Sequence, residues 1–157
     1  MRSYIFEQLD FVRRQTLSVV REVPEKVSEI IPDGVNNHIK WNAGHIYFVL
    51  ERFSFSVNQE PTEVPEHYDS LFRPGSKPRE ITSAWPSMNE LVDRLEGQVS
   101  RIEKLYESRL QETVKSPYTT SKGLKLTTVE EFLSFCLYHE GMHFDKIKTI
   151  LNRNQKD

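Results

Sequence analysis

The sequence predicts an all-α fold, a four-helix bundle, and two observations support this prediction. Apolar residues recur every three or four positions in four separate segments, and the alternation typical of half-buried strands is almost absent. Segments of roughly 20–25 residues give helices about 30–37 Å long. Four amphipathic helices of similar length bury their apolar stripes most simply against one another.

A break containing proline and glycine separates the first two helices. The first apolar stripe runs from Ile5 to Val23 and ends at Pro24, and the break covers Pro24–Gly34. A second periodic segment follows over Asn36–Val57. We expect these two segments to form the first and second helices of the bundle.

The third and fourth helices each begin at a candidate capping box, a serine or threonine followed three residues later by glutamate. Ser87 and Glu90 form this pattern before the third apolar stripe, which extends to Leu110. Thr127 and Glu130 form it again before the fourth stripe. We expect both helices to start at these positions.

The second and third helices are joined by Asn58–Pro86, an unusually long connection for a compact domain. At about 3.3 Å per residue, an extended chain of this length can return along the whole bundle. We therefore predict an up-down-down-up topology with a long crossover between helices 2 and 3. The crossover is expected to be an ordered cover rather than a loose loop, because it contains several large apolar residues: Tyr68, Leu71, Phe72 and Trp85.

Composition favours a single domain over residues 1–157. The chain has 21 basic and 23 acidic residues, for a net charge of −2. Without a basic excess we expect no nucleic-acid partner, and without an apolar run of about 20 residues we expect no membrane span. The first ten residues lack the apolar region of a secretory signal. One cysteine, Cys136, excludes an internal disulfide, so we expect a reduced, cytoplasmic protein.

His139 and His143 lie one helical turn apart and leave the same face of the fourth helix. The rest of that face is apolar, so both imidazoles are expected to be buried. Burying unpaired imidazoles is costly, and a divalent metal removes the cost by accepting both lone pairs. A surface position or structural hydrogen bonding is the alternative interpretation of the pair. The apolar residues of the face are Phe132, Cys136, Ile147 and Ile150.

Residues His139–His143 also match the HExxH pattern of zinc proteases, in which the glutamate is the general base. That chemistry needs a third metal ligand, usually from farther along the chain. The fourteen residues after His143 contain neither histidine nor cysteine. Asp145 points about 240° around the helix from His139. A protease of ordinary layout is therefore not expected.

The third ligand is expected from the second helix, at His45. This residue is central to a mixed polar and aromatic face, and the small residues Ala43 and Gly44 before it permit close helix approach. Three histidines leave an open position on the metal, which is typical of catalytic rather than structural sites. Of the other histidines, His38 is expected to face solvent or cap the helix, and His67 is expected to be exposed.

Two other ligand sets can be compared with this one. A di-iron centre needs Glu-x-x-His on two helices, and the second helix has no glutamate three residues before His45. Cys136 shares the face of His139 and is either a softer ligand or a small buried hydrophobe.

The chain resembles the DinB/YfiT-type metal-binding four-helix superfamily, specifically its DinB-like subgroup. The matching segments, in order, are Asn37–Ile46, Leu71–Pro78, Ser87–Leu91 and Leu126–Ile147, the last containing YHEGMHFDKI. The resemblance implies an up-down-down-up bundle, a homodimer and one divalent ion, often zinc or nickel. Carried over by motif, the three ligands fall on His45, His139 and His143. Similar sequences usually have glycine where Asp145 stands.

Characterised relatives include metal-dependent transferases that use low-molecular-weight thiols, and others carry a hydrolase assignment. The resemblance therefore implies a metal-dependent transferase acting on a thiol and an electrophilic small molecule. A hydrolase of the same fold, or a metal-binding module without catalysis, is the alternative. Arg52, two turns beyond His45, either pairs with an anionic group of the thiol or simply extends into solvent. Glu140 is either a proton carrier or acceptor beside the metal, or part of an inter-helix salt bridge.

Overall fold

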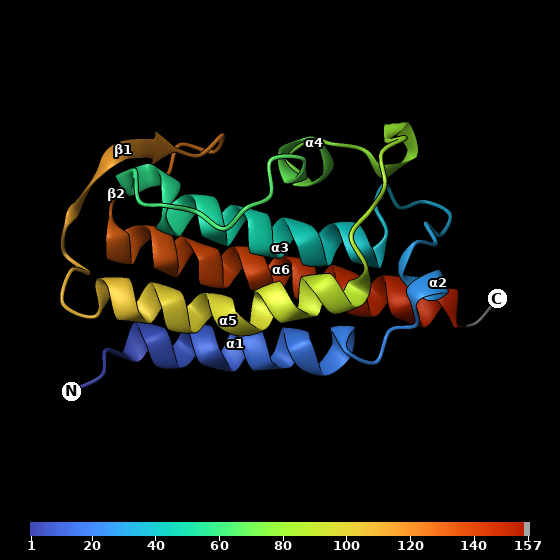
Figure 1. Ribbon diagram of the computed structural model, residues 1–157, viewed down its shortest axis with the longest axis horizontal. Coiled ribbons are helices and arrows are strands. Elements are labelled where there is room, and N and C mark those ends of the chain that lie inside the picture. The colour runs from blue at the N-terminus through green and yellow to red at the C-terminus, as the bar shows by residue number, and fades with distance from the viewer. Residues whose placement is uncertain (156–157) are drawn as a thin grey trace.

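A computed structural model describes residues 1–155 and consists mainly of four long helices lying side by side (Figure 1). Helices α1 and α6 run in one direction, and α3 and α5 run in the other (Figure 1). The predicted up-down-down-up topology is therefore confirmed. Within residues 1–155, none of the helices is both long and apolar enough to cross a membrane. The four long helices are α1 (Tyr4–Val20), α3 (Ile39–Ser54), α5 (Met88–Tyr106) and α6 (Val129–Asn154).

The predicted starts of the third and fourth helices are correct to within one residue, whereas the second helix begins at Ile39, three residues after the expected Asn36. The Ser87 hydroxyl accepts from the Glu90 backbone N–H at 3.1 Å and caps α5 as expected. The capping box of α6, however, is Thr128 with Glu131, one residue after the predicted pair. Helix α5 ends at Tyr106 rather than near Leu110, because the chain turns there toward a strand.

A small antiparallel hairpin precedes α6, which the sequence did not predict. It consists of β1 (Thr113–Thr119) and β2 (Lys125–Thr128). In β1 only Val114 is buried, so the strand shows none of the alternation by which half-buried strands are found. The fold is thus mostly helical with a two-stranded addition at one end of the bundle (Figure 1).

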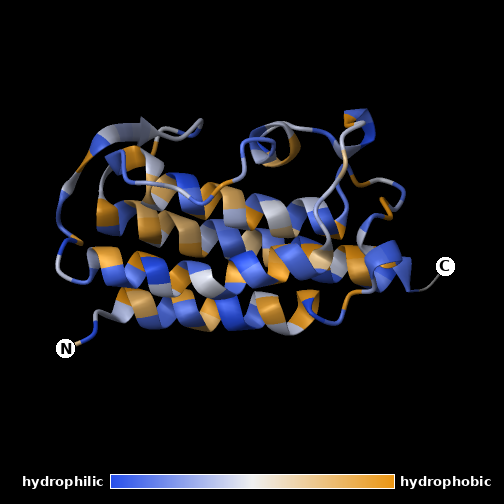
Figure 2. Ribbon diagram, viewed as in Figure 1, coloured by the Kyte–Doolittle hydropathy of each residue, from blue (hydrophilic) through white to orange (hydrophobic). Residues whose placement is uncertain are grey.

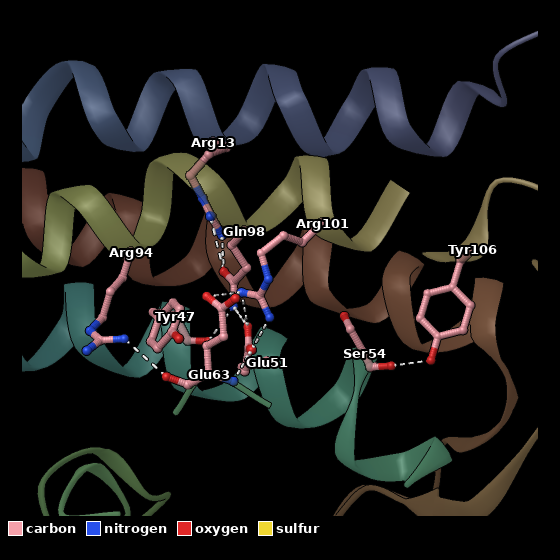
Figure 3. A network of polar contacts seen from close by, with 9 residues as sticks. All are labelled: Arg13, Tyr47, Glu51, Ser54, Glu63, Arg94, Gln98, Arg101 and Tyr106. Carbon is pink, nitrogen blue, oxygen red and sulfur yellow. Dashed lines mark hydrogen bonds and ion pairs between the residues drawn. The ribbon is translucent and has the colours of Figure 1, made fainter. Parts of the chain in front are cut away.

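Apolar residues recur along every long helix (Figure 2) and meet in two buried clusters, one at each end of the bundle. A buried polar network lies between the helices (Figure 3). Arg13 of α1 donates to Gln98 of α5, and Gln98 donates to Glu51 of α3 at 2.8 Å. Arg13 also pairs with Glu140 of α6 at 2.9 Å, so this network joins all four helices.

The crossover contains two short helices, α4 and η2, and is ordered against α3, as predicted. Tyr68, Leu71 and Phe72, on α4, are fully buried. Gly44 of α3 faces the Phe72 ring so closely that a Cβ atom there would overlap the ring. Gly44 therefore permits a close approach, but to the crossover rather than to another long helix. The short helices outside the bundle are α2 (Glu25–Ser28), η1 (Ser56–Asn58), α4 (Tyr68–Phe72) and η2 (Pro78–Glu80).

We predict that Gly44→Ala destabilises the protein by about 1–3 kcal/mol, because the Phe72 ring must move from a packed position. The matched control is Gly97→Ala on α5, where an added Cβ meets nothing within 4 Å. That change is expected to stabilise the protein by roughly 0.5–1 kcal/mol through helix propensity. Urea unfolding measures both. Equal changes of the same sign in the free energy of unfolding of the two variants would contradict this account of Gly44.

Candidate metal centre

The structure brings His45, His139 and His143 together between α3 and α6. All three side chains are buried, with 5%, 9% and 5% of their surface exposed. The ring centroid of His45 lies 4.9 Å from that of His139 and 4.7 Å from that of His143. One ring nitrogen of each residue lies within 4.8 Å of the others. The two helices thus place three potential metal ligands around one point.

His45 is held by the crossover. Its Nδ1 atom lies 2.6 Å from the backbone carbonyl oxygen of Phe72. A carbonyl oxygen only accepts, so Nδ1 donates the proton and Nε2 keeps its lone pair. Nε2 points at the cluster and lies 3.1 Å from Nε2 of His139.

His143 is held in the same way by Asn42, one turn before His45 on α3. The Asn42 amide nitrogen donates to the His38 carbonyl oxygen at 2.9 Å, which fixes the orientation of the amide. Its Oδ1 atom therefore faces Nδ1 of His143, at 2.8 Å, and accepts a hydrogen bond from it. As in His45, Nε2 is left with a lone pair. Such outer partners typically orient metal-ligating histidines.

Burial keeps the three imidazoles neutral. Desolvation, followed by the neighbouring imidazoles, lowers the pKa of His143 to about 2. The same causes lower the pKa of His139 to about 3, and desolvation also lowers the pKa of His45. Aromatic rings contribute to this burial, since the Trp41 ring stacks on His45 with centroids 4.4 Å apart. At neutral pH, then, all three residues offer lone pairs rather than charges.

These residues fit a divalent transition metal. Two nitrogens bound tetrahedrally to zinc at about 2.0–2.1 Å lie about 3.3 Å apart, close to the 3.1 Å between His45 and His139. Neutral imidazoles suit zinc and nickel alike, and in His45 and His143 the second ring nitrogen is hydrogen-bonded, as is usual for metal ligands. Cys136 is not part of the clustered group. It packs in an apolar cluster, where burial raises the pKa of its thiol, and so behaves as a small hydrophobe.

Glu140 lies between the two histidines in sequence but faces another helix. Its carboxylate accepts from Arg13 at 2.9 and 3.0 Å and from the Thr16 hydroxyl at 2.8 Å, all on α1. The inter-helix salt bridge is therefore the interpretation that the structure supports. Because its acceptor sites are engaged by α1, Glu140 is not placed as the general base of a HExxH protease.

The structure also places the two remaining histidines and Asp145. His38 is buried rather than solvent-facing and is the N-cap of α3, accepting from the Trp41 backbone N–H at 2.8 Å. His67 is exposed, as expected. Asp145 is also exposed, on the side of α6 away from the cluster, and lies 3.8 Å from Lys148.

A cavity of about 630 Å³ opens onto the three histidines. Arg52 lines it together with apolar side chains of α3 and α6 and residues of the hairpin. The cluster is thus buried but reached by a cavity large enough for a small molecule. Sequence reasoning placed Asn42, His45 and Arg52 on one face but gave Asn42 no role, and it missed the Phe72 carbonyl and the hairpin wall. Only Asn42, at i−3 from His45, lay within reach of a helical-face argument.

The fold and the cluster define a class, a four-helix bundle with a candidate metal site of three buried imidazoles. The chain belongs to the DinB superfamily, whose family model matches residues 8–147, which confirms the resemblance. A crystal structure of a conserved protein from Enterococcus faecalis is similar in fold, with a TM-score of 0.71 and 14% identity. The match covers 100% of this chain and 99% of that one. No functionally curated protein matches the sequence.

We predict that Asn42→Leu lowers the affinity for a divalent metal about 10- to 100-fold, because Nδ1 of His143 loses its acceptor. Asn42→Asp keeps an acceptor at this position and should retain most of the affinity. Asn36→Leu, at an exposed position before α3, is the control. Competition with a chromogenic chelator measures the affinity. Unchanged affinity in Asn42→Leu would refute the role of Asn42.

We also predict that the metal-free protein loses stability as the pH falls below about 6.5, the ordinary histidine pKa. The folded-state pKa values are depressed, so the unfolded state binds more protons and stability rises with pH in this range. Each buried histidine contributes up to about 1.4 kcal/mol per pH unit. Burial also lowers the pKa of His38, to about 4, so His38 contributes to the same loss of stability.

Urea unfolding in chelator between about pH 6.5 and pH 5 checks this dependence. His38→Asn keeps a good N-cap and should make the slope shallower, whereas His67→Asn, at an exposed position, should not. If the free energy of unfolding of the wild type does not change with pH in this range, the imidazoles are not buried in their neutral form.

Proposed function

We propose that this protein is a metal-dependent transferase that joins a low-molecular-weight thiol to an electrophilic small molecule. The observation that supports this most is the convergence of three neutral imidazoles at the inner end of a cavity. Zinc or nickel is the proposed ion. Homodimerisation, which the family resemblance implies, stays a prediction, as does a cytoplasmic location.

The proposed chemistry needs no nucleophile from the protein. A divalent cation held by three neutral ligands keeps its full charge and favours the deprotonated form of a thiol or water. In the proposed reaction the thiol sulfur forms a bond to carbon, the leaving group departs with its electron pair, and the thiol proton passes to solvent. The lone cysteine of the chain, Cys136, is buried with a raised thiol pKa and so is not suited to act as the nucleophile itself.

The residues around the cluster have defined tasks in this proposal. The Phe72 carbonyl and the Asn42 amide keep Nδ1 of His45 and His143 protonated, so that Nε2 faces inward. The Trp41 ring stacks on His45 and helps to exclude water from it, whereas the Phe135 ring packs on His139 where both line the cavity. The cavity leaves one side accessible, which favours a site that exchanges ligands over a sealed structural one.

Elemental analysis of freshly purified protein tests the metal proposal. We expect about one zinc or nickel per wild-type chain and a near-complete loss in His45→Ala and His139→Ala. His67→Ala changes an exposed histidine of the crossover and should retain the metal. Full metal retention in the two cluster variants would refute the proposed ligand set.

A second assay separates the three candidate functions. Thiols are combined with a generic electrophile, and candidate esters and amides are offered with water alone, each with and without chelator. We expect a chelator-sensitive transfer to the thiol that is lost in His45→Ala. Chelator-sensitive hydrolysis alone would favour the hydrolase alternative, and metal binding without either activity would favour a non-catalytic module.

A further inference from the structure

The charge of the cavity is concentrated at one residue. Among the described residues that line it, Arg52 is the only one with a full charge at neutral pH. No carboxylate belongs to this described lining, which otherwise consists of apolar side chains, hydroxyl residues and the three neutral imidazoles. A cavity of this composition attracts an anion to the arginine.

Arg52 lies well away from the histidines, on the same face of α3. Arg52 is seven positions after His45, so the two residues are about 10.5 Å apart along the helix axis. The guanidinium lies over the Phe48 ring, 5.4 Å from its centroid. Its ion pair with Asp69 is long, at 3.9 Å, and both partners are more than half exposed. Such a pair is weak, so the planar donors of Arg52 are available to a ligand.

The cavity between these two points is lined mainly by apolar side chains. Phe48 and Phe53 of α3 contribute to this lining, and so do Phe135 and Met142 of α6. The hairpin closes over this space, with the Tyr118 ring 5.3 Å from that of Phe53. A ligand that reaches from the histidines to Arg52 therefore passes between apolar walls.

We propose that the cavity binds an elongated small molecule with an apolar body and one anionic end, and that Arg52 selects the anion. The proposal rests on the proposed function for what happens at the histidine end and names the substrate class of that same site. The anion belongs either to the thiol or to the electrophile, and both have the same chemistry at Arg52.

Calorimetric titration of the metal-loaded protein with two matched pairs of compounds tests this proposal. The first pair is ω-mercapto-octanoate and its neutral amide, and the second is octanoate and octanamide. In the wild type we expect at least one of the acids to bind roughly fivefold more tightly than its amide. A preference confined to the mercapto pair assigns the anion to the thiol, and a preference in both pairs shows that sulfur is not required and favours the electrophile.

The variants isolate Arg52. Arg52→Gln should bring the acid-to-amide ratio close to one, Arg52→Lys should keep part of it, and Arg73→Gln should leave it unchanged. Arg73 is the matched control because it also pairs with Asp69, at 3.7 Å, but does not line the cavity. Equal binding of acid and amide to the wild type, or a preference that survives in Arg52→Gln, would overturn the proposal.

Metal content, measured on the same samples, separates this inference from the proposed function. Metal bound without any acid preference would refute the Arg52 proposal alone. An Arg52-dependent acid preference in protein that retains no metal would refute the metal-dependent function but not the ligand class.

Discussion

The burial of three basic side chains between two helices is the constraint on which this structure depends. Each imidazole of the cluster has lost most of its contact with water, and each buried polar nitrogen needs a partner. The Phe72 carbonyl and the Asn42 amide satisfy Nδ1 of His45 and His143. The Nε2 atoms are thereby directed toward one another, an arrangement that a shared cation stabilises. The crossover is therefore part of the site, because it supplies one of these partners. It can pack this closely on α3 because Gly44 has no side chain.

The polar residues of the HExxH pattern lie on two different faces of helix α6, which explains how the pattern exists without protease geometry. His139 and His143 face α3, whereas Glu140 faces α1 and is paired with Arg13. Removing either partner of a buried ion pair leaves an uncompensated charge, which is strongly unfavourable. The pair therefore fixes the rotation of α6 and, with it, the direction of the two histidines. The motif's glutamate is thus engaged in a contact between helices.

Much of this could be predicted from the sequence, because helical periodicity reports which residues share a face. That periodicity was enough for the bundle and for the pairing of His45 with the α6 histidines, and the length of the Asn58–Pro86 connection was enough for the topology. The hairpin was missed because β1 buries only Val114 and so has no alternating pattern. The partners of Glu140 and His45 lie 127 and 27 residues away, and no local pattern encodes such contacts. Distant pairings of this kind decide whether a polar residue is structural or functional.

The central claim is that one divalent cation is held by three imidazole nitrogens drawn from α3 and α6. Anomalous diffraction at the absorption edge of the bound metal tests it most directly, using crystals of protein purified without chelator. The account predicts a single strong peak between Nε2 of His45, His139 and His143, about 2.0–2.1 Å from each. A peak at other residues, or rings that remain hydrogen-bonded to one another in metal-saturated crystals, would contradict it.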